Sequence, residues 1–183
     1  SSVALRTRAT GRATRSTASS FWQSAADAYG MSLGDSADAH ASRITNAGSI
    51  VAEAVATGWL GTADSRAYGV RAQGESDLHN DGLIQATATA RGGSVFGAAS
   101  AQSHGMLLGA GRNEVVNAGD LVARAEAAGG FVFGSLSGKA LAVGIGAGDG
   151  GNRILNAGRI VVDAASNVEA TSYGIRTGSG DDL

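Results

Sequence analysis

Short apolar segments, separated by glycine or asparagine, follow one another along most of the chain. Apolar peaks recur about every 10 to 15 residues, and within a segment apolar and polar positions alternate, as Ile160, Val162 and Ala164 do. This alternation is typical of β-strands. The segments are too short and too rich in glycine for helices of normal length. The pattern therefore predicts an all-β protein.

The strands belong to an internal repeat made of three short words that recur in the same order. The first word is a turn of the form Asn-Ala-Gly or Asn-Asp-Gly, and the second is centred on a glycine, as in "AYGMSLG" and "SYGIRTG". The third is "GGSVFGAAS" from Gly92, matched by "GGFVFGSLS" from Gly129. The turn asparagines, spaced by 34, 37 and 39 residues, are Asn46, Asn80, Asn117 and Asn156.

A period of 34 to 39 residues with short strands and Gly or Asn corners predicts a parallel β-solenoid, a right-handed β-helix. Either each repeat forms one long coil or, as we predict, it forms two coils of about 18 residues each. Each strand then stacks on its copy about 4.8 Å away, so that equivalent residues form rows along the axis. We expect residues 1–183 to be a single solenoid segment, with residues 1–24 as an atypical first coil.

Two of these rows are predicted to be structural. The turn asparagines are expected to hydrogen-bond to their own copies, as stacked asparagines do in cross-β structures. Asn and Gly also tolerate the left-handed conformation that a tight corner requires. A second row of Asx residues lies eight positions beyond each glycine of the second word: Asp38, Asp77, Asn113, Asn152 and Asp182.

Composition narrows the class of protein further. The 29 glycines and the mainly Ala, Val, Ile and Leu apolar content suit a narrow interior filled by small side chains, while 16% charged residues with clear periodicity argue against disorder. A net charge of −2 disfavours a nucleic-acid partner. The absence of cysteine removes disulfides and thiolate metal sites. No apolar run approaches the roughly 20 residues that span a bilayer.

Candidate chemistry is sparse, and we expect no enzyme and no cofactor. The histidines His40, His79 and His104 have no ligand spacing, and neither a nucleophile elbow nor a P-loop occurs. The segment "GSGDDL" at the end of the chain is similar to the core of calcium-binding nonapeptide repeats. Its weak calcium candidates are Asp181 and Asp182, with Asp149 in a second copy; we interpret them as Asx turns instead and keep a calcium-stabilised solenoid as an alternative.

A polysaccharide-cleaving or glycan-binding β-helix is the other alternative. The enzymes of this kind need a clustered acid–base pair, often with basic or aromatic residues along the sugar groove. Aromatic residues make up 5% of this chain, and its carboxylates are scattered. Several aromatics fall at equivalent positions of the repeat, Phe96 with Phe133 and Tyr68 with Tyr173, which favours a structural, stacked role.

The words "ITNAGSI", "VVNAGDL", "ILNAGRI", "AYGV", "SYGI" and "GSGDDL" resemble the repeat regions of large bacterial surface proteins. The closest comparison is the right-handed β-helical passenger of autotransporters and related adhesin-like solenoids. This resemblance covers residues 25 to 183. It implies export across the bacterial envelope and an extended, fibrous shape.

We therefore expect a secreted, non-enzymatic solenoid that forms a stiff structural or adhesive rod or filament on a bacterial surface. The expected partners are further copies or neighbouring solenoid segments, and glycans or proteins of a host or cell surface. The pattern breaks off within "GSGDDL", and neither end carries an obvious polar cap. For this reason we expect the segment to belong to a longer solenoid or an assembly.

Overall fold

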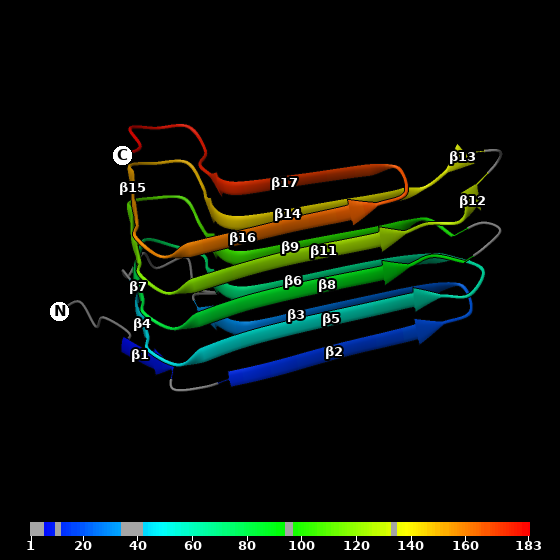
Figure 1. The fold of residues 1–183 in the computed structure, drawn as a ribbon, viewed down its shortest axis with the longest axis horizontal. Helices are drawn as coiled ribbons and strands as arrows, with labels where there is room; N and C mark the ends of the chain where they lie inside the picture. Colours follow the sequence, from blue (N-terminus) through cyan, green and yellow to red (C-terminus); the bar gives the residue numbers. More distant parts are fainter. Residues whose placement is uncertain (1–5, 10–11, 34–41, 94–96, 133–134) are drawn as a thin grey trace.

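The chain forms a parallel β-solenoid of about 4 turns in a computed structural model, which confirms the predicted fold class (Figure 1). The structure describes residues 6–9, 12–33, 42–93, 97–132 and 135–183, and in these the regular structure is strand throughout, without a helix. Accordingly, no helix of the described part is long and apolar enough to cross a membrane.

Three five-stranded parallel sheets run the length of the solenoid. The short sheet contains β1 (Arg6–Ala9), β4 (Ser42–Asn46), β7 (Ser76–Asn80), β10 (Asn113–Asn117) and β15 (Asn152–Asn156). The first long sheet contains β2 (Arg12–Ser20), β5 (Ser49–Gly58), β8 (Leu83–Arg91), β11 (Asp120–Ala128) and β16 (Arg159–Ser166). The second long sheet contains β3 (Gln23–Leu33), β6 (Thr62–Ala72), β9 (Ala99–Leu108), β14 (Gly138–Ala147) and β17 (Glu169–Arg176).

Each repeat forms one coil of three strands, so the prediction of two coils per repeat is wrong. Asn46 pairs in register with Asn80, and Asn80 pairs with Asn117, which makes neighbouring coils one full repeat apart. The apolar peaks that gave the impression of shorter coils mark three different sheets of the same coil. In every coil two of the three strands are long and account for most of the repeat. These long strands have 8 to 11 residues each.

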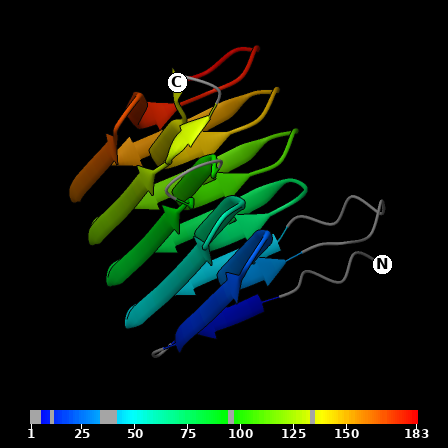
Figure 2. The same ribbon diagram turned by 90° about the vertical axis from the view of Figure 1, so that its right-hand side faces the viewer.

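The two long sheets lie face to face and the short sheet closes one side, which gives each coil a wedge-shaped outline (Figure 2). Next to the short sheet the core consists mainly of large aliphatic side chains such as Ile44, Ile84 and Leu121. Further from the short sheet, between the long sheets, the buried apolar cluster of the described residues consists of alanines, including Ala54, Ala88 and Ala125 in one stacked row. The buried serines Ser65 and Ser103 lie among them and donate hydrogen bonds to the backbone carbonyls of Ala54 and Ala86. Small side chains let the two long sheets approach each other closely, as the composition indicated.

The narrow edge of the wedge is the corner at which the first long sheet passes into the second. In the first two coils this corner is a tight turn, between β2 and β3 and between β5 and β6. In the fourth coil it carries a small antiparallel hairpin, β12 (Phe131–Val132) with β13 (Ser135–Leu136). The predicted match of Phe96 with Phe133 lies outside the described residues. Tyr68 and Tyr173 do share a row of the second long sheet, but His104 and Val143 lie between them.

Candidate functional site

The short sheet is the most distinctive part of the molecule, because four of its strands, β4, β7, β10 and β15, begin and end with polar residues, most of which are buried. Burial alternates along β10, so that Asn113, Val115 and Asn117 face the interior while Glu114 and Val116 face outward. The strands β10 and β15 both start and end with asparagine, and β4 and β7 start with serine. Two columns of polar side chains therefore border the aliphatic core on this side.

The turn asparagines form a continuous hydrogen-bonded ladder. The side-chain amide nitrogen of each residue donates to the amide oxygen of the next: Asn46 to Asn80, Asn80 to Asn117 and Asn117 to Asn156, each at 2.7 Å. The first three side chains are fully buried, and that of Asn156, on the last coil, is exposed. Since a buried amide without partners costs about 1–3 kcal/mol, this pairing removes a large penalty at each of the three buried asparagines.

The ladder also holds the corners of the coils. The oxygen of Asn46 accepts a hydrogen bond from the backbone nitrogen of Gly48 at 3.2 Å. The Asn117 amide donates to the carbonyl of Gly119 at 3.2 Å. Asn46, Asn117 and Asn156 thus link their own turns to a neighbouring coil, which explains why the chain repeats this residue type at the turn.

The second polar column differs from the predicted one at Asp77. Asn113 pairs in register with Asn152 and with Ser76, so Asp77 lies one position outside the column and faces solvent. The reason is the length of the corner: the connection between β6 and β7 is one residue shorter than that between β9 and β10. Counting residues from a glycine cannot reveal such a difference. Asp38 lies outside the described residues.

The remaining members of this column are joined to one another. The Asn113 amide donates to the side-chain oxygen of Asn152 at 2.7 Å, and Asn152 donates to the Asp182 carboxylate at 2.8 Å. Asp182 also accepts from the backbone nitrogen of Asn152 at 3.1 Å. Hydrogen bonds from the side chains of Asn152 and Thr177 and from the backbone of Asn152 lower the pKa of Asp182.

The other calcium candidates lie on exposed turns of the last coils. The Asp149 carboxylate accepts hydrogen bonds from the backbone nitrogen of Ser179 at 2.8 Å and from its hydroxyl at 2.9 Å, and these bonds lower the pKa of Asp149. Asp181, in the same turn region, is also exposed. Within the described part of the chain, no group of three or more His, Cys, Asp and Glu side chains has an arrangement that could hold a metal ion.

Charged side chains on the outside form ion pairs between neighbouring coils. The pairs are Arg15 with Glu53 at 2.6 Å, Arg43 with Asp77 at 2.7 Å, Arg153 with Glu114 at 2.8 Å and Lys139 with Glu169 at 3.1 Å. All are solvent-exposed, so each is worth about 0–1 kcal/mol. Each pair joins two residues that the strand register places side by side, so the pairs agree with the register and add little to the stability of the fold.

A stack of rings on the outer face of the second long sheet was not anticipated as a unit. Tyr29 stacks on Tyr68 with 5.1 Å between ring centroids, and Tyr68 stacks on His104 with 5.4 Å. The Arg71 guanidinium lies 5.7 and 5.6 Å from the two tyrosine ring centroids. The word "AYG" in two neighbouring repeats and "SHG" in the third was the signal that could have revealed this row. Burial, followed by the neighbouring Tyr29, raises the pKa of Tyr68.

His104 is held in its neutral form. Burial, with a smaller contribution from the positive charge of Arg176, lowers the pKa of His104 to about 4. Its Nδ1 is buried without a hydrogen-bond partner. In contrast, His79 is exposed, and its Nε2 lies 3.0 Å from a carboxylate oxygen of Asp81. His40 lies outside the described residues.

The lowered pKa of His104 predicts that the protein loses stability in mild acid. In the unfolded chain the imidazole takes up a proton near its ordinary pKa of about 6.5, whereas the folded protein resists protonation until about pH 4. Protonation therefore favours the unfolded state throughout this window. We expect the free energy of unfolding to fall by about 2 kcal/mol between pH 7 and pH 5.

Urea titrations of the wild type and of His104→Phe at both pH values measure this effect. Phenylalanine keeps a ring in the stack but cannot be protonated, so the variant should lose most of the difference between pH 7 and pH 5. The carboxylates of Asp149 and Asp182 titrate at lower pH and contribute little in this range. An unchanged difference in the variant would mean that His104 is not the responsible group.

No protein-family model matches this chain, and searches of curated proteins and of solved structures find no significant match.

Proposed function

We propose that this chain is a structural or adhesive segment of an extracellular filament or rod on a bacterial surface. The observation that carries the proposal is the continuous set of ladders along the axis. Three parallel sheets link every described coil to the next, and a column of asparagine amides links the second coil to the fifth. The resemblance of the turn words to surface-exposed solenoids supports the extracellular setting. Like other repeat proteins, such a segment has a length that scales with the number of coils.

The mechanical role follows from the direction of the hydrogen bonds. Backbone bonds of a parallel sheet lie between strands, so here they run along the solenoid axis. Tension along the axis is therefore shared by the bonds of three sheets at each boundary between coils. From the second coil onward, two coils cannot separate without breaking these bonds and the Asn–Asn bond together. This arrangement resists stretching and bending with little dependence on side-chain chemistry at the surface.

Force spectroscopy of the 183-residue chain held at its two ends tests the mechanical part. We expect stepwise lengthening, with each step releasing one coil of 34 to 39 residues. At about 3.3–3.6 Å per extended residue, one step corresponds to about 110–140 Å of added chain length. Gradual extension at low force, without steps of this size, would contradict a load-bearing rod.

The cellular part is tested with antibodies raised against the folded chain. They should label intact cells that produce the protein, or filaments shed from them, before the cells are opened. Antibodies against a protein known to be cytoplasmic in the same cells serve as the control. Labelling that requires lysis would rule out a surface role.

A further inference from the structure

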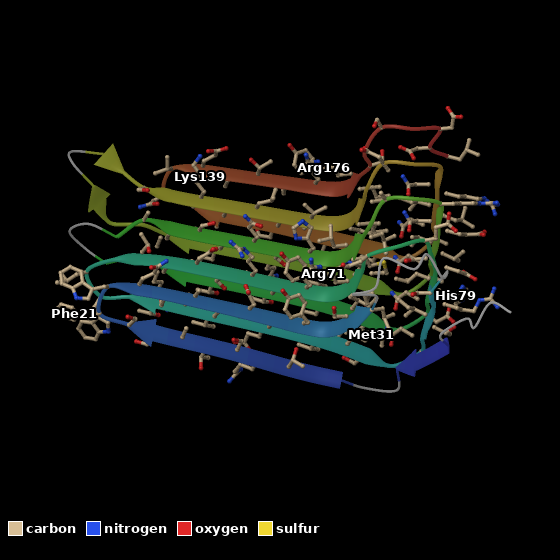
Figure 3. All side chains as sticks on the ribbon, turned by 180° about the vertical axis from the view of Figure 1, so that it is seen from behind. Phe21, Met31, Arg71, His79, Lys139 and Arg176 are labelled. Carbon is tan, nitrogen blue, oxygen red and sulfur yellow. The ribbon has the colours of Figure 1, made fainter. Side chains whose placement is uncertain are left out.

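Both tryptophans of the chain lie on one corner of the solenoid, where they are exposed to solvent. Trp22 and Trp59 occupy the tight turns that join the first long sheet to the second in the first two coils, and Phe21 precedes Trp22. Their exposed fractions are 68% for each tryptophan and 57% for Phe21. Figure 3 shows Phe21 at the end of the long strands opposite His79, which lies on the short sheet.

These rings are presented by a rigid backbone. The backbone nitrogen of Trp59 donates to the carbonyl of Ser20 at 3.0 Å, and that of Leu60 donates to the carbonyl of Phe21 at 2.9 Å. The rings of Phe21 and Trp22 pack edge to face, with 5.4 Å between their centroids. The two turns are therefore joined by backbone hydrogen bonds, as the strands are. The aromatic side chains are attached to a backbone that these bonds hold in place.

The concentration of aromatics at this corner is selective. Aromatic residues make up only 5% of the chain, yet the connections between the long sheets contain several of them. Besides Phe21, Trp22 and Trp59, Phe131 lies in β12, in the equivalent connection of the fourth coil. The corresponding connection of the fifth coil, Asn167–Val168, has no aromatic residue. Folding does not require these side chains, because neither tryptophan nor Phe21 belongs to the buried core. Exposed rings gathered on one feature of a monomer are typical of a binding surface.

The polar residues around the rings indicate the chemistry of the ligand. The two turns have the sequences "SSFWQ" (residues 19–23) and "TGWLGT" (residues 57–62), which contain hydroxyl and amide side chains and no ionisable group. Charged residues lie just outside these turns: Arg91 pairs in register with Thr57, and Asp64 follows Thr62 by two residues. A neutral sugar ring offers C–H groups that pack on an aromatic face and hydroxyls that pair with Ser, Thr and Gln.

We propose that this aromatic corner, defined as Phe21, Trp22 and Trp59, binds an uncharged oligosaccharide along the solenoid edge. The proposal rests on the adhesive form of the proposed function and names its partner. Repeating coils about 4.8 Å apart place successive aromatic turns in a row along the axis, which suits a linear chain of sugars better than a single ring. The absence of Lys and Arg from both turns disfavours an anionic lipid surface.

Intrinsic fluorescence tests this proposal directly, because the chain contains only two tryptophans and both belong to the aromatic corner. The probes are the neutral hexasaccharides of β-1,4-linked glucose and of β-1,4-linked N-acetylglucosamine. We expect at least one of them to give a saturable change in tryptophan emission. Calorimetry should then show that the double variant Trp22→Ala/Trp59→Ala binds that sugar at least about tenfold more weakly.

The variants separate loss of binding from loss of structure. Because both tryptophan rings are mostly exposed, the double variant should melt at the wild-type temperature. Tyr173→Ala, which removes a ring that is 41% exposed on another face, should leave the affinity unchanged. Equal loss of affinity in the tyrosine variant would overturn the assignment of this corner.

Other occupants of the corner give different results, each of which overturns the proposal. Emission that changes with neutral phosphatidylcholine vesicles but with neither sugar indicates a membrane contact. Emission that changes with protein concentration alone indicates a second copy of the chain. Tighter binding of an acidic hexasaccharide such as oligogalacturonate indicates a charged ligand, and no response to either neutral sugar removes the site. None of these results affects the force measurement, so the rod is tested separately.

Discussion

Gly69→Ala is expected to destabilise the solenoid by about 3 kcal/mol, which corresponds to a fall in Tm of about 6–12 °C for a chain of this size. Gly69 is the glycine of the second repeat word and lies in β6, facing the core. A β-carbon here would lie 2.5 Å from the carbonyl oxygen of Gly105 and 2.5 Å from a methyl carbon of Ile84. The first clash is with the backbone of the next coil, so the two coils would have to move apart.

The same row of residues supplies a matched control. Gly174 is the equivalent residue of the last coil, and a β-carbon there meets no atom within 4 Å. Gly174→Ala should therefore leave the melting temperature within a few degrees of the wild type. Neither residue has a positive φ, so the difference between the two variants is a matter of space alone. Thermal melts followed by circular dichroism measure it, and equal effects would refute the close approach of the coils.

Asn117→Ala is expected to lower the free energy of unfolding by about 3 kcal/mol. The cause is the loss of hydrogen bonds, whereas in Gly69→Ala it is the added side-chain volume. Asn117 is fully buried, accepts from Asn80 and donates to Asn156, both at 2.7 Å. Alanine leaves the Asn80 donor and the Asn156 acceptor without these partners and also opens a small cavity. Denaturant titration followed by circular dichroism gives the change in the free energy of unfolding.

The end of the same ladder provides the comparison for this variant. Asn156 is exposed and its amide also donates to the carbonyl of Gly158 at 3.1 Å, so solvent can replace the bonds that are lost. Asn156→Ala should cost about 1 kcal/mol or less. Equal costs at the two positions would mean that burial of the ladder contributes nothing, and an unchanged stability for Asn117→Ala would refute the ladder as a stabilising element.

The pairing of residues between coils could be predicted from the sequence at positions where the same residue type must recur because each copy contacts the next. The turn asparagines recur because each needs the next as a hydrogen-bond partner, and their pairing follows directly from their spacing. The glycines of the second word also share one row, because each is packed against the backbone of the following coil where such a coil is present. Residues whose role depends on an identical neighbour thus reveal both the period and the fold.

Features that depend on the length of corners were not predictable in the same way. The predicted number of coils per repeat was wrong, because the alternation of apolar and polar residues identifies strands but not the sheet to which each strand belongs. Asp77 was misplaced because one corner is a residue shorter than its equivalents. The exposure of Trp22 and Trp59 could not be predicted from the sequence either. An apolar residue in a repeat is equally consistent with a place in the stacked core and with a place on an exposed turn.

From the second to the fourth coil, most of the difference in coil length is absorbed at the corner between the long sheets. Ala63, Ala99 and Gly138 occupy one row, yet they follow the ladder asparagines of their own coils by 17, 19 and 21 residues, respectively. Strand register beyond the corner is kept in each case. At this edge the gene can therefore gain codons for two residues per repeat while the three sheets keep their pairing, so that a change in repeat length need not change the scaffold.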